Sequence, residues 1–133
     1  MSTIQQLLLL NLRVGWFGVA AGILSGLTVG LWFHKENWLG GYGSHPRRLL
    51  RLGHVSFFGL GFLNLLFALT LFITPYALAT ATIISFCLIV GAVTMPICCV
   101  LCAWRKSLHC LFPIPVISLC VAVGLIVAGF SPL

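Results

Sequence analysis

Acidic side chains are almost absent from this chain. Of its 133 residues only Glu36 is acidic, and 6% of all residues are charged. Transporters that move protons or ions on buried carboxylates need such groups inside their helices. Hydrolases with paired carboxylates or a Ser-His-Asp triad need them beside a substrate. The composition therefore argues against a carboxylate-driven transporter and against both kinds of hydrolytic site.

Nucleotide-binding motifs are also missing. The chain has 14 glycines, but they lie in apolar runs or in the segment after the first run, and none forms a Walker or dinucleotide-binding pattern. The net charge of +6 is the only feature that could suggest nucleic acid. Because the basic residues stand at the ends of apolar runs, we expect no nucleic-acid partner.

Long apolar runs dominate what is present. Hydrophobic residues make up 61% of the chain, and a helix needs roughly 20 mostly apolar residues to cross a bilayer. Four runs without Asp, Glu, Lys or Arg meet this length, at 14–33, about 52–73, 77–104 and about 111–130. The sequence predicts an all-α integral membrane bundle of four transmembrane helices, forming a single domain over residues 1–133 and surrounded by lipid.

The basic residues indicate an orientation for these helices. Six of the seven lie between runs one and two or between runs three and four: Lys35, Arg47, Arg48, Arg51, Arg105 and Lys106. By the positive-inside rule these two loops are cytoplasmic, which leaves both termini on the outer, periplasmic side of a bacterial inner membrane. Residues 1–12 lack the basic residues and cleavage site of a secretory signal, so they either extend the first helix or lie along the outer interface.

Small residues predict where helices approach closely. Gly18, Gly22, Gly26 and Gly30 recur at strict four-residue spacing, which places them on one helix face. In the second run Gly61 and Asn64 share a face, and an amide in mid-membrane is expected to face protein rather than lipid. These six residues are predicted packing residues. Whether the glycines face this chain or another protein stays open at this level.

Histidines and arginines near the cytoplasmic side suggest a haem site. His34 ends the first run and His54 begins the second, so antiparallel packing could bring both to one depth as axial ligands of haem b. Arg51 and Arg47 stand one and two turns before His54, where guanidinium groups could bind propionates, and Gly61 would leave room for the ring. The alternative is that these interfacial side chains meet lipid phosphates.

A sulfur-rich face of the third run offers a second candidate site. Met95, Cys98, Cys99 and Cys102 occupy adjoining positions of one helix face, and thioether with thiolate ligands selects Cu(I). Cys99 and Cys102 also have CxxC spacing, as in four-helix thiol-quinone oxidoreductases, but on the reducing side of the membrane. The alternative is ordinary packing by soft side chains.

No self-sufficient catalytic set emerges, and almost no mass lies outside the predicted spans. We therefore expect a non-catalytic accessory subunit of a larger inner-membrane complex, of respiratory or redox type, whose partners are other membrane-protein subunits. The alternatives are a b-type haem electron-transfer protein with cytoplasmic bis-histidine ligation, and a protein that handles Cu(I) or thiols.

Overall fold

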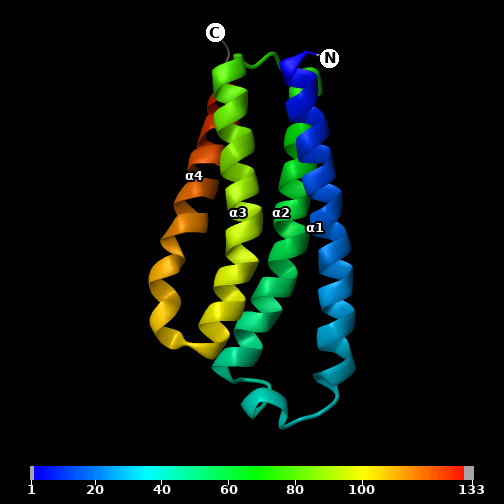
Figure 1. The fold of residues 1–133 in the computed structure, drawn as a ribbon, viewed down its shortest axis with the longest axis vertical. Helices are drawn as coiled ribbons and strands as arrows, with labels where there is room; N and C mark the ends of the chain where they lie inside the picture. The colour runs from blue at the N-terminus through cyan, green and yellow to red at the C-terminus, as the bar shows by residue number, and fades with distance from the viewer. Residues whose placement is uncertain (1, 131–133) are drawn as a thin grey trace.

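The computed structural model describes residues 2–130, in which four long α-helices and two short 3₁₀ segments form the whole secondary structure, without a strand (Figure 1). Their bounds are α1 Thr3–Phe33, η1 Trp38–Gly40, α2 His45–Ile73, α3 Leu78–Trp104, η2 Lys106–Leu111 and α4 Pro113–Ala128. Helices α1, α2 and α3, and α4 taken together with η2, are long and apolar enough to cross a membrane. The prediction of an all-helical chain with four such segments is confirmed.

Helix α1 begins well before the first apolar run, because its start is capped. The Ser2 hydroxyl accepts a hydrogen bond from the Gln5 N–H at 3.3 Å, and the Gln5 side chain accepts one from the Ser2 N–H at 2.9 Å. This reciprocal capping box satisfies two amide groups that a helix start would otherwise leave unpaired. Residues 3–12 therefore extend α1, which is one of the two interpretations of this segment.

Helix α2 also begins before its apolar run. The Ser44 hydroxyl accepts from the Arg47 N–H at 3.4 Å, and Pro46 lies in the first turn, where its missing N–H costs nothing. The run at 52–73 is thus the apolar part of a longer helix whose first two turns are basic. The fourth helix instead begins after the start of its run at about 111, because α4 begins at Pro113 and residues 106–111 form η2.

The four helices follow one another as antiparallel neighbours, with α1 against α2, α2 against α3 and α3 against α4. Both termini lie at one end of the bundle (Figure 1). A buried core near that end joins three helices: Phe67, Leu71, Ala81, Ile84, Leu88 and Ala122. Helices α1 and α4 are much less buried than α2 and α3, so the two outer helices leave most of their apolar surface open.

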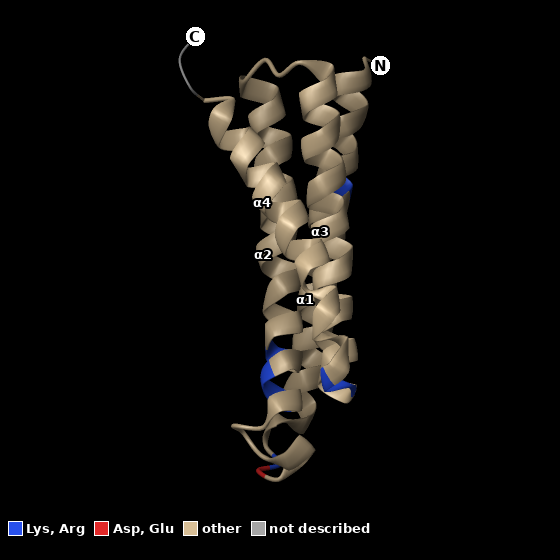
Figure 2. Ribbon diagram, turned by 90° about the vertical axis from the view of Figure 1, so that its left-hand side faces the viewer, with Lys and Arg blue, Asp and Glu red and all other residues tan. Residues whose placement is uncertain are grey.

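Charged residues gather at the end of the bundle opposite the termini (Figure 2). That end holds the loop between α1 and α2, the first turns of α2, and η2. One basic residue, Arg13, lies instead on α1 in the half nearer the termini. The long sides of the bundle are otherwise free of Lys and Arg.

Candidate functional site

Helices α1 and α2 cross with their backbones in close contact. A Cβ atom at Gly61 would lie 2.9 Å from the Gly15 carbonyl oxygen and 3.1 Å from the Val19 nitrogen. A Cβ atom at Gly18 would lie 3.0 Å from the Gly61 Cα. The two backbones therefore touch, which only glycine permits. Gly15 belongs to this crossing although it lies outside the four-residue series of the sequence.

Two further glycines of the series face aromatic rings of α2. Gly22 lies under the ring of Phe58 and Gly26 under the ring of His54, so that a Cβ at either would come within 3 Å of ring atoms. A Cβ atom placed on Gly30 would meet nothing within 4 Å among the described residues. In this structure the partner of Gly18, Gly22 and Gly26 is α2 of the same chain.

His54 is fixed within this α1–α2 seam. Its Nδ1 lies 3.0 Å from the Ser25 hydroxyl oxygen, and the Ser25 hydroxyl donates to the Gly22 carbonyl at 3.0 Å. Ser25 thus links the His54 imidazole to the backbone of α1. The ring also meets Phe58 edge-on, with centroids 5.4 Å apart. His54 therefore packs against α1 along its ring and through its Nδ1.

His34 and His54 lie at different levels of the bundle. His34 is the exposed C-cap of α1, whereas His54 lies beside Gly26, eight residues earlier in that helix. At 1.5 Å per residue the axial offset is about 12 Å. Two axial ligands must face one iron at one depth. The residues present do not fit a haem shared by these histidines, and bis-histidine ligation stays a prediction that this geometry does not support.

The two arginines next to this region bind the loop rather than face His54. Arg47 is only 2% exposed, and its guanidinium donates to the Phe33 carbonyl at 2.9 Å and to the Glu36 carbonyl at 3.2 Å. It also stacks over the Phe33 ring at 4.4 Å. Arg51 lies over the Tyr42 ring at 4.3 Å and donates to its carbonyl at 3.4 Å. Arg47 thus supplies donors to carbonyls at the C-terminal end of α1, where helices leave acceptors unpaired.

The sulfur-rich face of α3 lies against α2. Cys98, Cys99 and Cys102 are buried and Met95 is half-buried. A Cβ at Gly53 would lie 3.2 Å from the Cys99 Cβ, so that the two helices approach closely here. Among residues 2–130 no three His, Cys, Asp or Glu side chains lie together in a way that could hold a metal ion. The predicted Cu(I) site therefore gains no support from the geometry.

A buried polar contact in the terminal half was not anticipated from the sequence. Asn11 of α1 donates to the Ser85 hydroxyl oxygen of α3 at 2.6 Å and to the Leu7 carbonyl at 2.8 Å. Asn64 of α2 is also fully buried and donates to the Leu60 carbonyl at 2.9 Å. The carbonyl oxygens of both amides have no partner among the described residues. An amide inside the apolar stretch before residue 14 was the signal that could have found Asn11.

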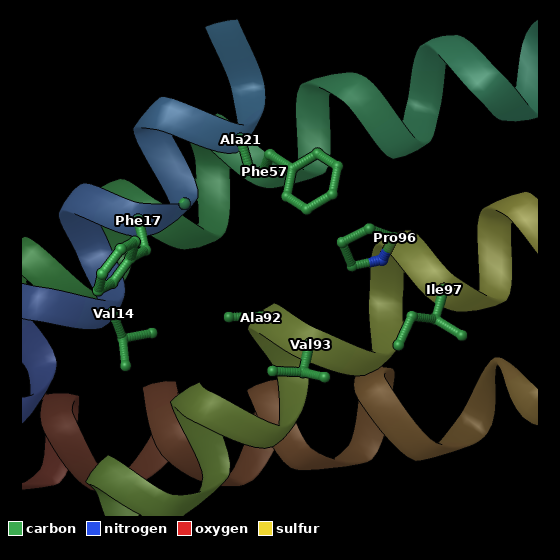
Figure 3. A pocket seen from close by; sticks show the side chains of 9 residues that line it. Val14, Phe17, Ala21, Phe57, Ala92, Val93, Pro96 and Ile97 are labelled. Carbon is green, nitrogen blue, oxygen red and sulfur yellow. The ribbon is translucent and has the colours of Figure 1, made fainter. Parts of the chain in front are cut away.

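An apolar slot of about 380 Å³ opens between α1, α2 and α3 (Figure 3). It is lined by Val14, Phe17, Gly18, Ala21, Phe57, Ala92, Val93, Pro96 and Ile97. Small residues on α1 and α3 leave this space free, and Phe17, Val93 and Ile97 at its edge are at least half exposed. The slot can receive an apolar side chain or an alkyl chain, but it presents almost no polar group for chemistry.

Comparisons with known proteins add no information about the function, so the proposal below rests on the geometry. No protein-family model, curated protein or solved structure matches the chain.

Proposed function

We propose that this protein is a non-catalytic accessory subunit of a larger inner-membrane complex, and that it docks on its partner through the slot between α1 and α3. The slot carries the proposal, because it is a sizeable apolar space lined by small residues and open at the side of the bundle. Helices in lipid associate by close packing of such surfaces, since burying apolar area alone gives no net drive there.

The outer helices support a docking role. Large apolar side chains of α1 are more than half exposed, including Phe17 at 74% and Trp16 at 64%. Phe17 lines the slot, whereas Trp16 lies on another part of the exposed face of α1. A partner helix seated there could contact both the slot and the exposed face of α1 without rearranging the four helices.

The orientation belongs to the same proposal. Placing the basic end of the bundle in the cytoplasm satisfies the positive-inside rule and puts both termini on the outer side (Figure 2). A bacterial inner membrane, whose inner face is the cytoplasm, is the setting that fits this arrangement.

Filling the slot tests the docking proposal. Ala21→Leu places a larger side chain in the slot, whereas Ala20→Leu makes the same change at the adjacent exposed position. Membranes containing either variant at native abundance are solubilised in mild detergent, and the size of the assembly is measured on native gels. We expect the wild type and Ala20→Leu in one large assembly and Ala21→Leu released from it. A wild-type protein that migrates alone, or an Ala21→Leu variant that stays in the assembly, would refute the proposal.

A further inference from the structure

A second cluster of basic side chains joins two elements at the charged end of the bundle. The rings of His45, the first residue of α2, and His109, in η2, have centroids 5.5 Å apart. Arg48 lies one turn after His45 on the same face of α2, since residues three apart are neighbours on a helix. Lys106 begins η2, and its carbonyl contacts Nδ1 of His109. The two imidazoles thus meet between the start of α2 and η2, and Arg48 and Lys106 each lie one turn from an imidazole along their own element.

This basic cluster (His45, Arg48, Lys106 and His109) has little within the chain to neutralise it. The only acidic residue, Glu36, lies in the loop that precedes α2, and its side chain forms no hydrogen bond with the cluster in the described residues. In addition, Nδ1 of His45 is buried without a hydrogen-bond partner among the described residues. A buried polar atom without a partner is costly, so the chain by itself leaves this imidazole unsatisfied.

The surroundings of the cluster distinguish between ligands of opposite charge. Two close imidazoles could in principle bind a metal cation, but Arg48 and Lys106 add fixed positive charge beside them. An anion is favoured instead, and the N-terminal end of α2 adds the positive end of a long helix dipole. Oxygen atoms of a phosphate can accept from imidazole, ammonium and guanidinium groups together.

The face of α2 above Arg48 indicates where the rest of the ligand lies. Leu52 and Val55 follow Arg48 at helical spacing and are 44% and 59% exposed. Gly59, the next residue on this face, has nothing within 4 Å of a Cβ placed on it. The basic cluster is thus followed along α2 by exposed apolar positions. This arrangement matches a lipid whose charged headgroup is attached to an acyl chain.

We propose that the basic cluster binds the phosphate of an anionic phospholipid, with an acyl chain lying along Leu52 and Val55. The site is separate from the slot between α1 and α3, so it does not depend on the docking proposal. The phospholipid would hold η2 against the start of α2 and stabilise this end of the bundle.

A charge-matched pair of variants tests the phosphate contact. Lys106→Gln and Lys35→Gln each remove one positive charge at the same end of the bundle, but Lys35 lies over the Trp32 ring, outside the cluster. The full chain is purified in detergent, and its melting temperature is measured against increasing phosphatidylglycerol, phosphatidylcholine or sodium phosphate. Circular dichroism confirms that each variant is folded.

We expect phosphatidylglycerol to raise the melting temperature, whereas phosphatidylcholine and sodium phosphate leave it unchanged. Lys106→Gln should weaken the apparent affinity about fivefold, which corresponds to one lost basic contact at a membrane surface, and Lys35→Gln should not. His109→Gln should weaken it as well. Equal responses of Lys106→Gln and Lys35→Gln, or no response of the wild type, would overturn the site. An equal response to sodium phosphate would overturn the lipid as its ligand.

Discussion

Replacing Gly61 by alanine tests the backbone contact between α1 and α2. A Cβ atom there would lie 2.9 Å from a carbonyl oxygen of α1 and 3.1 Å from an amide nitrogen, both of which belong to the backbone. Neither atom can rotate away, so α1 and α2 must separate along their crossing. A gap of 0.5–1 Å forfeits roughly a quarter to a half of each van der Waals contact. Overpacking of this kind costs about 1–3 kcal/mol.

The control for this change lies on the same helix. Gly59 is exposed, and a Cβ placed on it meets no atom within 4 Å. Gly59→Ala therefore changes only the helix propensity, which favours alanine by up to about 1 kcal/mol. The unfolding free energy of both variants can be measured in mixed micelles by adding sodium dodecyl sulfate and following helicity by circular dichroism.

We expect Gly61→Ala to lose about 1–3 kcal/mol relative to the wild type while Gly59→Ala is unchanged or slightly more stable. Equal stability of the two variants would refute the reasoning, because it would mean that α1 and α2 do not touch at this glycine. If the loss of unfolding free energy in Gly61→Ala disappears in a chain lacking α1, the result would support the contact between α1 and α2 at Gly61.

Two further changes test buried polar contacts. Arg47→Lys should lower the free energy of unfolding by about 1–3 kcal/mol, because one ammonium group cannot reproduce the planar guanidinium that binds two carbonyls. Increased protease cleavage between residues 34 and 44 would report the loosened loop. Arg48→Lys, at an exposed position, should leave this cleavage unchanged. Ser85→Ala removes the acceptor of Asn11 and should cost about 0.5–2 kcal/mol in the same unfolding assay. If Ser85→Ala lost nothing in a background that already carries Asn11→Ala but lost stability in the wild type, the hydrogen bond would be the cause.

The helices could be predicted from the sequence because they depend on residues close together in the chain. Four apolar runs and the basic residues between them predict four long helices. The start of α1 was less well predicted, because its capping box precedes the apolar run and adds stability that hydropathy does not measure.

The candidate haem site shows what spacing along a sequence cannot decide. Spacing along one helix places Arg47 two turns before His54, but the depth of His34 relative to His54 depends on how far α1 slides along α2. That register is determined by the glycine crossing, which places Gly26 beside His54. Arg47 then lies beside the last turn of α1, where it binds the Phe33 carbonyl.

The sequence by itself determined the number of helices, their apolar character and the end of the bundle that carries the positive charge, since each follows from residues close together in the chain. Only the tertiary structure decided which helix meets the glycines of α1, which level each histidine occupies, and that His45 meets His109. The physical reason is that helix register and pairing depend on contacts between residues far apart in the sequence. The composition of an apolar run does not indicate those contacts, because apolar side chains are stable against lipid and against protein alike.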